Sequence, residues 1–130
     1  MAQSSNTLHE SEDKLRPETI DRHRAFVSLM EELEAADWYD QRVDAADDGE
    51  LREILAHNRD EEKEHAAMVL EWLRRRDESL DQHLRTYLFT DKPILAIEEE
   101  DTGGGGDDAP AAGDGHGSLG IGSLREEVNR

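Results

Sequence analysis

The sequence predicts an all-α protein: an antiparallel two-helix hairpin with a short third helix, two copies of which would pair into a four-helix bundle. Two long segments carry apolar residues at alternating spacings of three and four, the period of a helix with one buried stripe. An Asp-Asp-Gly turn at 47–49 separates them. The chain of 130 residues is 35% apolar and 37% charged, a thin supply for a self-sufficient core. Either much of the chain is unfolded or its apolar faces are covered by other copies.

The first long helix is expected from Pro17 to about residue 46, because proline suits a first helical turn and no Gly or Pro follows within that range. The second helix is expected over about 50–76, where three final arginines agree with the helix dipole. A shorter helix is expected over about 79–89. Pro93 ends the part of the chain for which regular structure is expected.

Composition divides the chain into four parts. Residues 1–16 are polar and are expected to be a flexible segment, and residues 17–97 hold the helical-hairpin domain. Residues 98–117 combine acidic residues with four consecutive glycines, which predicts a flexible linker. Apolar residues then return within 118–130, which is expected to be a docking peptide.

The composition also excludes several classes of function. A formal net charge of −18 without a basic stripe argues against nucleic-acid binding, and it attracts cations instead. Without cysteine the chain has neither disulfides nor a thiolate metal site. No apolar run is long enough to span a bilayer, so no membrane association is expected. These features suggest a soluble protein of the bacterial-cytoplasm type.

Three residues form a candidate metal site, with Glu32 on the first helix and Glu62 and His65 on the second. All three lie on the apolar stripes, where a carboxylate must be paired, protonated or bound to a metal. Positions 32 and 62 are each fifteen residues from position 47, so a hairpin turning there places them at one height. Two carboxylates and one imidazole suit iron, manganese or zinc.

One chain supplies half of the ligand set of a carboxylate-bridged di-iron centre. Two chains related by a twofold axis supply four Glu and two His, which is the full complement. The alternative is that Glu32, Glu62 and His65 belong to a charged helix surface, with Arg59 or Lys63 pairing the carboxylates at helical spacing.

Further acidic and imidazole side chains flank this site. Tyr39 lies two turns from Glu32 on the same stripe, as a hydrogen-bonding neighbour of the ligands or as a core residue. The other residues are either accessory metal ligands or parts of solvated helix faces: Glu31, Glu34, His57, Glu61 and Glu64.

The C-terminal segment carries Leu119, Ile121 and Leu124 beyond the linker. The intervening glycines suit an extended backbone laid into a groove, with alternate side chains filling pockets. The alternatives are a docking peptide and a frayed terminus without a role.

These motifs together resemble the encapsulated ferritin-like proteins, the iron-oxidising cargo of bacterial encapsulin nanocompartments. The resemblance rests on EELE at 31–34, WY at 38–39, DEEKEH at 60–65 and SLGIGSLR at 118–125. It implies a protomer that dimerises into a ferritin-like four-helix bundle, with dimers assembling into a decameric ring. It also implies that the C-terminal peptide binds an encapsulin shell.

The function expected from the resemblance is that of a ferroxidase in the lumen of an encapsulin nanocompartment. Glu32, Glu62 and His65 of each protomer would bind a di-iron centre that oxidises Fe(II) with dioxygen for mineral storage, with Glu31 and Glu34 as an accessory site. The alternatives are a non-catalytic acidic helical adaptor carried by its docking tail, and a structural manganese or zinc protein.

Overall fold

The computed structural model describes residues 7–108, and every regular element in that range is helical. The chain divides into two compact units at residues 82 and 83, and the candidate metal site lies wholly within the first. No helix among the described residues is long and apolar enough to cross a membrane. The all-α fold class predicted from the sequence is therefore confirmed.

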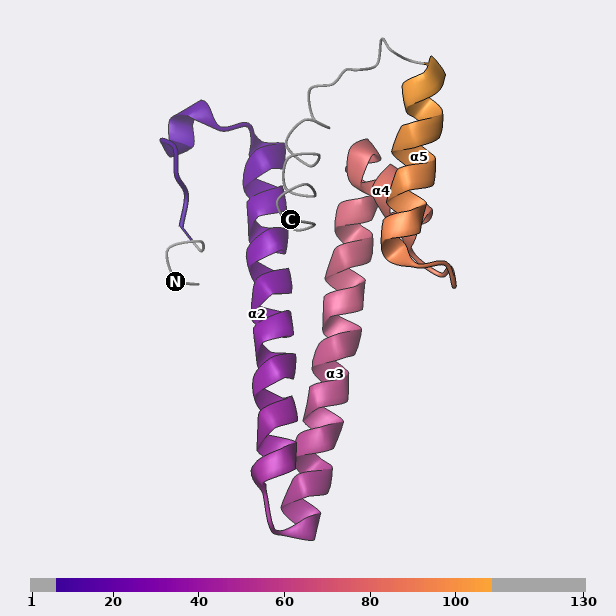
Figure 1. The fold of residues 1–130 in the computed structure, drawn as a ribbon. Helices are drawn as coiled ribbons and strands as arrows, with labels where there is room; N and C mark the ends of the chain where they lie inside the picture. The colour runs from indigo at the N-terminus through magenta and orange to yellow at the C-terminus, as the bar shows by residue number, and fades with distance from the viewer. Residues whose placement is uncertain (1–6, 109–130) are drawn as a thin grey trace. The chain divides into compact units, whose positions relative to one another are not determined.

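The first unit is dominated by two long helices that run side by side in opposite directions (Figure 1). Helix α2 spans Pro17–Ala45 and helix α3 spans Gly49–Arg74, with a tight turn between them. The turn is stabilised by Asp48, whose carboxylate accepts a hydrogen bond from the Leu51 backbone N–H at 2.9 Å and so caps α3. The predicted hairpin is confirmed, with α3 ending two residues earlier than expected.

The hairpin buries very little apolar surface. Within α2 and α3 only Ala66 and Leu73 are buried, while the predicted stripes are mostly half-buried. Large apolar side chains remain exposed on both helices: Phe26, Met30, Leu33, Trp38, Leu51, Ile54 and Met68. Exposed apolar surface on this scale is typical of a site that binds another molecule.

Helix α4 spans Glu78–Tyr87 and confirms the predicted short third helix. Asp77 precedes it and accepts a hydrogen bond from the Leu80 N–H at 3.0 Å. At the end of α3, both oxygens of Glu71 accept hydrogen bonds from the Arg74 guanidinium at 2.8 Å. Arg74 also pairs with Asp81, which links the end of α3 to α4.

A helix that the sequence analysis did not predict, α5, spans Ile94–Asp108 in the second unit. The flexible linker expected over 98–117 is therefore wrong for 98–108, and the remaining residues of that range lie outside the described part. The helix begins at the Pro93 carbonyl, which accepts from Ile97 N–H at 3.1 Å, and the Ile97 side chain is buried. Residues 98–100 are good helix formers. The glycines that follow them lower the mean helix propensity of the segment, so the sequence did not indicate a helix there.

The N-terminal segment expected to be flexible contains a short 3-10 turn, η1, at Glu12–Lys14. Residues 1–6 and the whole docking peptide, with Leu119, Ile121 and Leu124, lie outside the described residues.

Candidate metal centre

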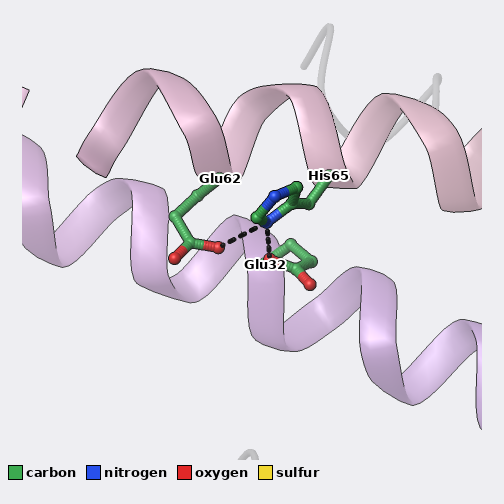
Figure 2. Close-up of side chains that lie close together, drawn as sticks. All are labelled: Glu32, Glu62 and His65. Atoms are coloured by element: carbon green, nitrogen blue, oxygen red, sulfur yellow. Dashed lines mark ion pairs between the residues drawn. The ribbon is translucent and has the colours of Figure 1, made fainter. Parts of the chain in front are cut away.

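The structure brings the three predicted ligands together at mid-height in the hairpin. Glu32 comes from the middle of α2, while Glu62 and His65 lie one turn apart on α3 (Figure 2). One ligand atom from each residue can be chosen so that all lie within 4.8 Å of one another. The His65 Nδ1 atom is 3.5 Å from a Glu32 oxygen and 3.6 Å from a Glu62 oxygen. Glu32 and Glu62 therefore lie at the same height along the hairpin, as the location of the turn predicted.

The three side chains lie at the surface of the hairpin rather than in its core. The exposed fractions are 26% for Glu32, 23% for Glu62 and 41% for His65. The three ligands were expected on a buried stripe, and this expectation was wrong for a single chain. Within one chain the three side chains are only partly buried. A single hairpin leaves one side of the cluster open.

The Glu62 carboxylate is close enough to Glu32 to disturb the ionisation of Glu32. A hydrogen bond with Glu62, partial burial and the Glu62 charge raise the pKa of Glu32, and these effects outweigh the opposite effect of His65. Two carboxylates in contact are stable when a proton or a cation lies between them. A cation bound between them would therefore relieve the repulsion that contributes to the raised pKa of Glu32.

Neighbouring basic side chains do not neutralise the carboxylate ligands. The Arg59 guanidinium pairs with Asp40 at 2.9 Å and with Asp60 at 3.1 Å, and Lys63 pairs with Asp60 at 3.7 Å. Among the described residues, the ion pairs of both cations are with aspartates rather than with Glu32 or Glu62. The alternative of a charged helix surface paired by Arg59 or Lys63 is thus not what the structure contains.

The five accessory candidates do not join the cluster within one chain. Among the described residues, the group that could hold a metal consists of the three central ligands. His57 lies 3.3 Å from Glu61 on the exposed surface of α3. The remaining accessory side chains are also exposed: Glu31, Glu34 and Glu64.

Tyr39 is half-buried, as its position on the stripe suggested. The contact described for its ring is with Arg42, whose guanidinium carbon lies 5.2 Å from the ring centroid. A hydrogen bond from Tyr39 to a ligand carboxylate stays a prediction.

An apolar groove lies farther along the hairpin, towards the end of α3. Its volume is about 420 Å³, and Met68, Val69 and Trp72 from α3 form one side, opposite Ala25 and Ser28 from α2. This groove was not predicted from the sequence. Met68 lies at the i+3 position from His65 and on the same side of α3, which was the available signal.

Comparison with known proteins shows the family of the chain. The family model described as EncFtn-like matches residues 7–91, well over half of the chain. The chain belongs to the EncFtn-like family. Within that family assignment, the Encapsulated ferritin-like protein of Rhodospirillum rubrum is 67% identical over 98% of this chain and 94% of its own length. The Ferritin-like protein of Thermotoga maritima is 57% identical over 77% of this chain and 88% of its own.

The chain is also similar to a protein named as encapsulin cargo and to a protein of known structure. The Encapsulin nanocompartment cargo protein EncC of Myxococcus xanthus is 36% identical over 45% of each chain. The crystal structure of protein ne0167 from Nitrosomonas europaea is 62% identical and has a TM-score of 0.65, covering 67% of this chain and 96% of that one. Membership of the EncFtn-like family supports an iron-related, ferritin-like role.

Proposed function

We propose that the protein is a ferroxidase that oxidises Fe(II) with dioxygen at a di-iron site shared by two protomers. The observation that carries this proposal is the convergence of Glu32, Glu62 and His65 from two helices at one height. Carboxylate oxygens with one imidazole nitrogen suit iron. Within residues 7–108, the ion pairs of the neighbouring Arg59 and Lys63 are with aspartates rather than with these glutamates. The donor set therefore fits the metal that the family relationship suggests.

The exposed side of the cluster supports sharing between two chains. His65 remains 41% exposed although its Nδ1 faces two carboxylates. A second copy placed over this side by a twofold axis would add the same three ligands, giving four carboxylates and two imidazoles for two iron ions. The exposed apolar residues of the hairpin provide contact area for such a partner.

The chemistry of the site follows from its charges. Four carboxylates carry up to four negative charges, which would balance the four positive charges of two Fe(II) substrate ions. The extra positive charge of two Fe(III) is better balanced by carboxylates than by neutral ligands, which favours oxidation. Each Fe(II) gives up one electron, so dioxygen consumes two ions when reduced to hydrogen peroxide and four when reduced to water.

The proposed destination of the oxidised iron is mineral within an encapsulin shell in the bacterial cytoplasm. An open assembly of helical hairpins, expected to be a decameric ring, encloses no storage volume of its own. The names of two relatives, one "encapsulated" and one a "nanocompartment cargo protein", support a shell partner. The segment proposed to bind the shell is residues 118–130.

The site assignment is tested by changing one ligand. Glu32→Ala removes two of the four proposed carboxylates from the dimer, so rapid Fe(II) oxidation should be lost. Anaerobic Fe(II) loading followed by oxygen, monitored by ferric absorbance, measures this loss. Glu53→Ala, which removes an exposed glutamate of α3 away from the cluster, is the matched control and should oxidise iron like the unchanged protein.

Two outcomes would contradict the proposal. Normal oxidation by Glu32→Ala would show that the cluster is not the site. If the unchanged protein produced no ferric absorbance, the non-catalytic adaptor or the structural metal protein would be the better description.

A further inference from the structure

Arg59 lies three residues before Glu62 on α3, at a spacing where opposite charges on a helix ordinarily pair. Its guanidinium is directed elsewhere. The Nη1 atom lies 2.9 Å from Asp40 on α2, and Nε lies 3.1 Å from Asp60. The side chain is only 23% exposed although it is charged, because it lies along the seam between the two helices. Arg59 is therefore held on a defined path across the hairpin.

The direction of this guanidinium matters for the metal centre. If Arg59 paired with Glu62, it would place a positive charge beside a proposed ligand and occupy an oxygen that a metal requires. A fixed cation beside a metal site weakens metal binding through direct repulsion as well as through this competition. Because the guanidinium pairs with Asp40 and Asp60 instead, the competition for Glu62 is avoided and the Arg59 charge is partly balanced.

Asp40 and Asp60 do not contribute equally to holding Arg59. Asp60 is the next residue on the same helix, holds Nε and also contacts Lys63 at 3.7 Å. Asp40 belongs to the opposite helix and holds Nη1, at the far end of the side chain. Without Asp40 this end would be released, while the Nε contact with Asp60 remains, and Glu62 would be its nearest alternative by helical spacing.

We propose that Asp40 is a positioning residue of the metal centre, which holds Arg59 across the hairpin seam and so keeps Glu62 available for a metal cation. The inference rests on the proposed function, because it treats Glu62 as a ligand. Asp40 acts through Arg59: by pairing with the guanidinium, it prevents Arg59 from competing with a metal for Glu62.

The test uses the full-length chain and Co²⁺, an air-stable probe for an Fe²⁺ site, titrated anaerobically and followed by visible absorbance. Asp40→Ala should weaken the apparent Co²⁺ affinity by about three- to tenfold, the effect of bringing one positive charge a few ångströms closer to a divalent ion. The Asp40 side chain is 66% exposed, so its removal leaves no cavity. Asp37→Ala is the matched control. It removes the same charge one turn from Asp40, and the Asp37 carboxylate accepts a hydrogen bond from the Gln41 side chain.

The double variant Asp40→Ala/Arg59→Gln separates competition from a structural role. If Asp40 acts through Arg59, removing the charges of both residues should restore Co²⁺ affinity to within about twofold of the unchanged protein. If Asp40 merely keeps the helices in register, the double variant should bind as weakly as Asp40→Ala, and the proposal would be overturned. Equal affinity of Asp40→Ala and Asp37→Ala would overturn it as well.

One more variant separates this inference from the proposed function. His65→Ala should lose Co²⁺ binding at the cluster. If His65→Ala bound Co²⁺ like the unchanged protein, the cluster itself would not be the metal site. If His65→Ala lost binding while Asp40→Ala did not, only the role of Asp40 would be wrong.

Discussion

Leu73 is the one large side chain among residues 7–108 that is completely buried, with no exposed surface. Most other large apolar residues of the hairpin are half-buried or exposed, Met68 to 58%. The two residues lie on the same helix but serve different purposes. Leu73 stabilises the single chain, whereas Met68 has exposed apolar surface that is available for contact with another copy under the proposed function.

Leu73→Ala should therefore lower the free energy of unfolding by about 3 kcal/mol, the usual cost of truncating a buried leucine. Met68→Ala should change the stability of the dilute, metal-free protein little, yet weaken association between copies. Denaturant unfolding at low concentration measures the first effect, and sedimentation equilibrium measures the second. Equal destabilisation of the dilute protein by both variants would contradict this division.

Ion pairs lie beside the buried Leu73 at the end of helix α3. Glu71 accepts hydrogen bonds from Arg74 and also from Arg75, at 2.7 Å. These contacts lower the pKa of Glu71 to about 2. A carboxylate with a lowered pKa favours the folded state only while it is ionised there.

The pH dependence follows from the direction of that shift. The contribution of Glu71 should be complete above its ordinary pKa of 4.5 and should disappear as the pH falls towards about 2. Glu71→Gln should therefore have its largest effect near neutral pH and little effect at the acid end of this range. Thermal melting temperatures of both proteins across the range measure the difference. A constant difference at every pH would show that ionisation of Glu71 does not contribute.

Periodicity explains which elements were predictable. Helices α2 and α3 and the common height of Glu32 and Glu62 followed from the helical repeat and the location of the turn, both of which are local properties. Helix α5 was not predicted because residues 98–100, which favour a helix, are followed by four glycines, which do not. The Arg59–Asp40 pair was also missed, since several aspartates and glutamates lie within reach of one arginine and only the folded geometry selects among them.

For the whole molecule, charge and apolar surface act in opposite directions. The exposed apolar residues of the hairpin favour association, but a net charge of −18 on each chain opposes it. Cations bound between protomers would offset the repulsion. Assembly is therefore expected to depend on metal.

Oligomeric mass with and without Fe(II), measured anaerobically at low salt, tests this dependence. Without metal the chain should be mainly monomeric. Fe(II) should produce dimers and, from these, larger ring-shaped assemblies. Sodium chloride should favour association to a smaller degree, because it screens charge without bridging the carboxylates. The same oligomer at equal concentration with and without metal would contradict metal-driven assembly.

The half-set of ligands in one hairpin also has a genetic consequence under the proposed function. A homodimeric centre is encoded once and built twice, so each substitution at Glu32, Glu62 or His65 enters both halves together. Such a centre cannot specialise its two iron positions through mutation of this gene alone. In a single-chain four-helix bundle the two halves are encoded separately, and selection can make them differ.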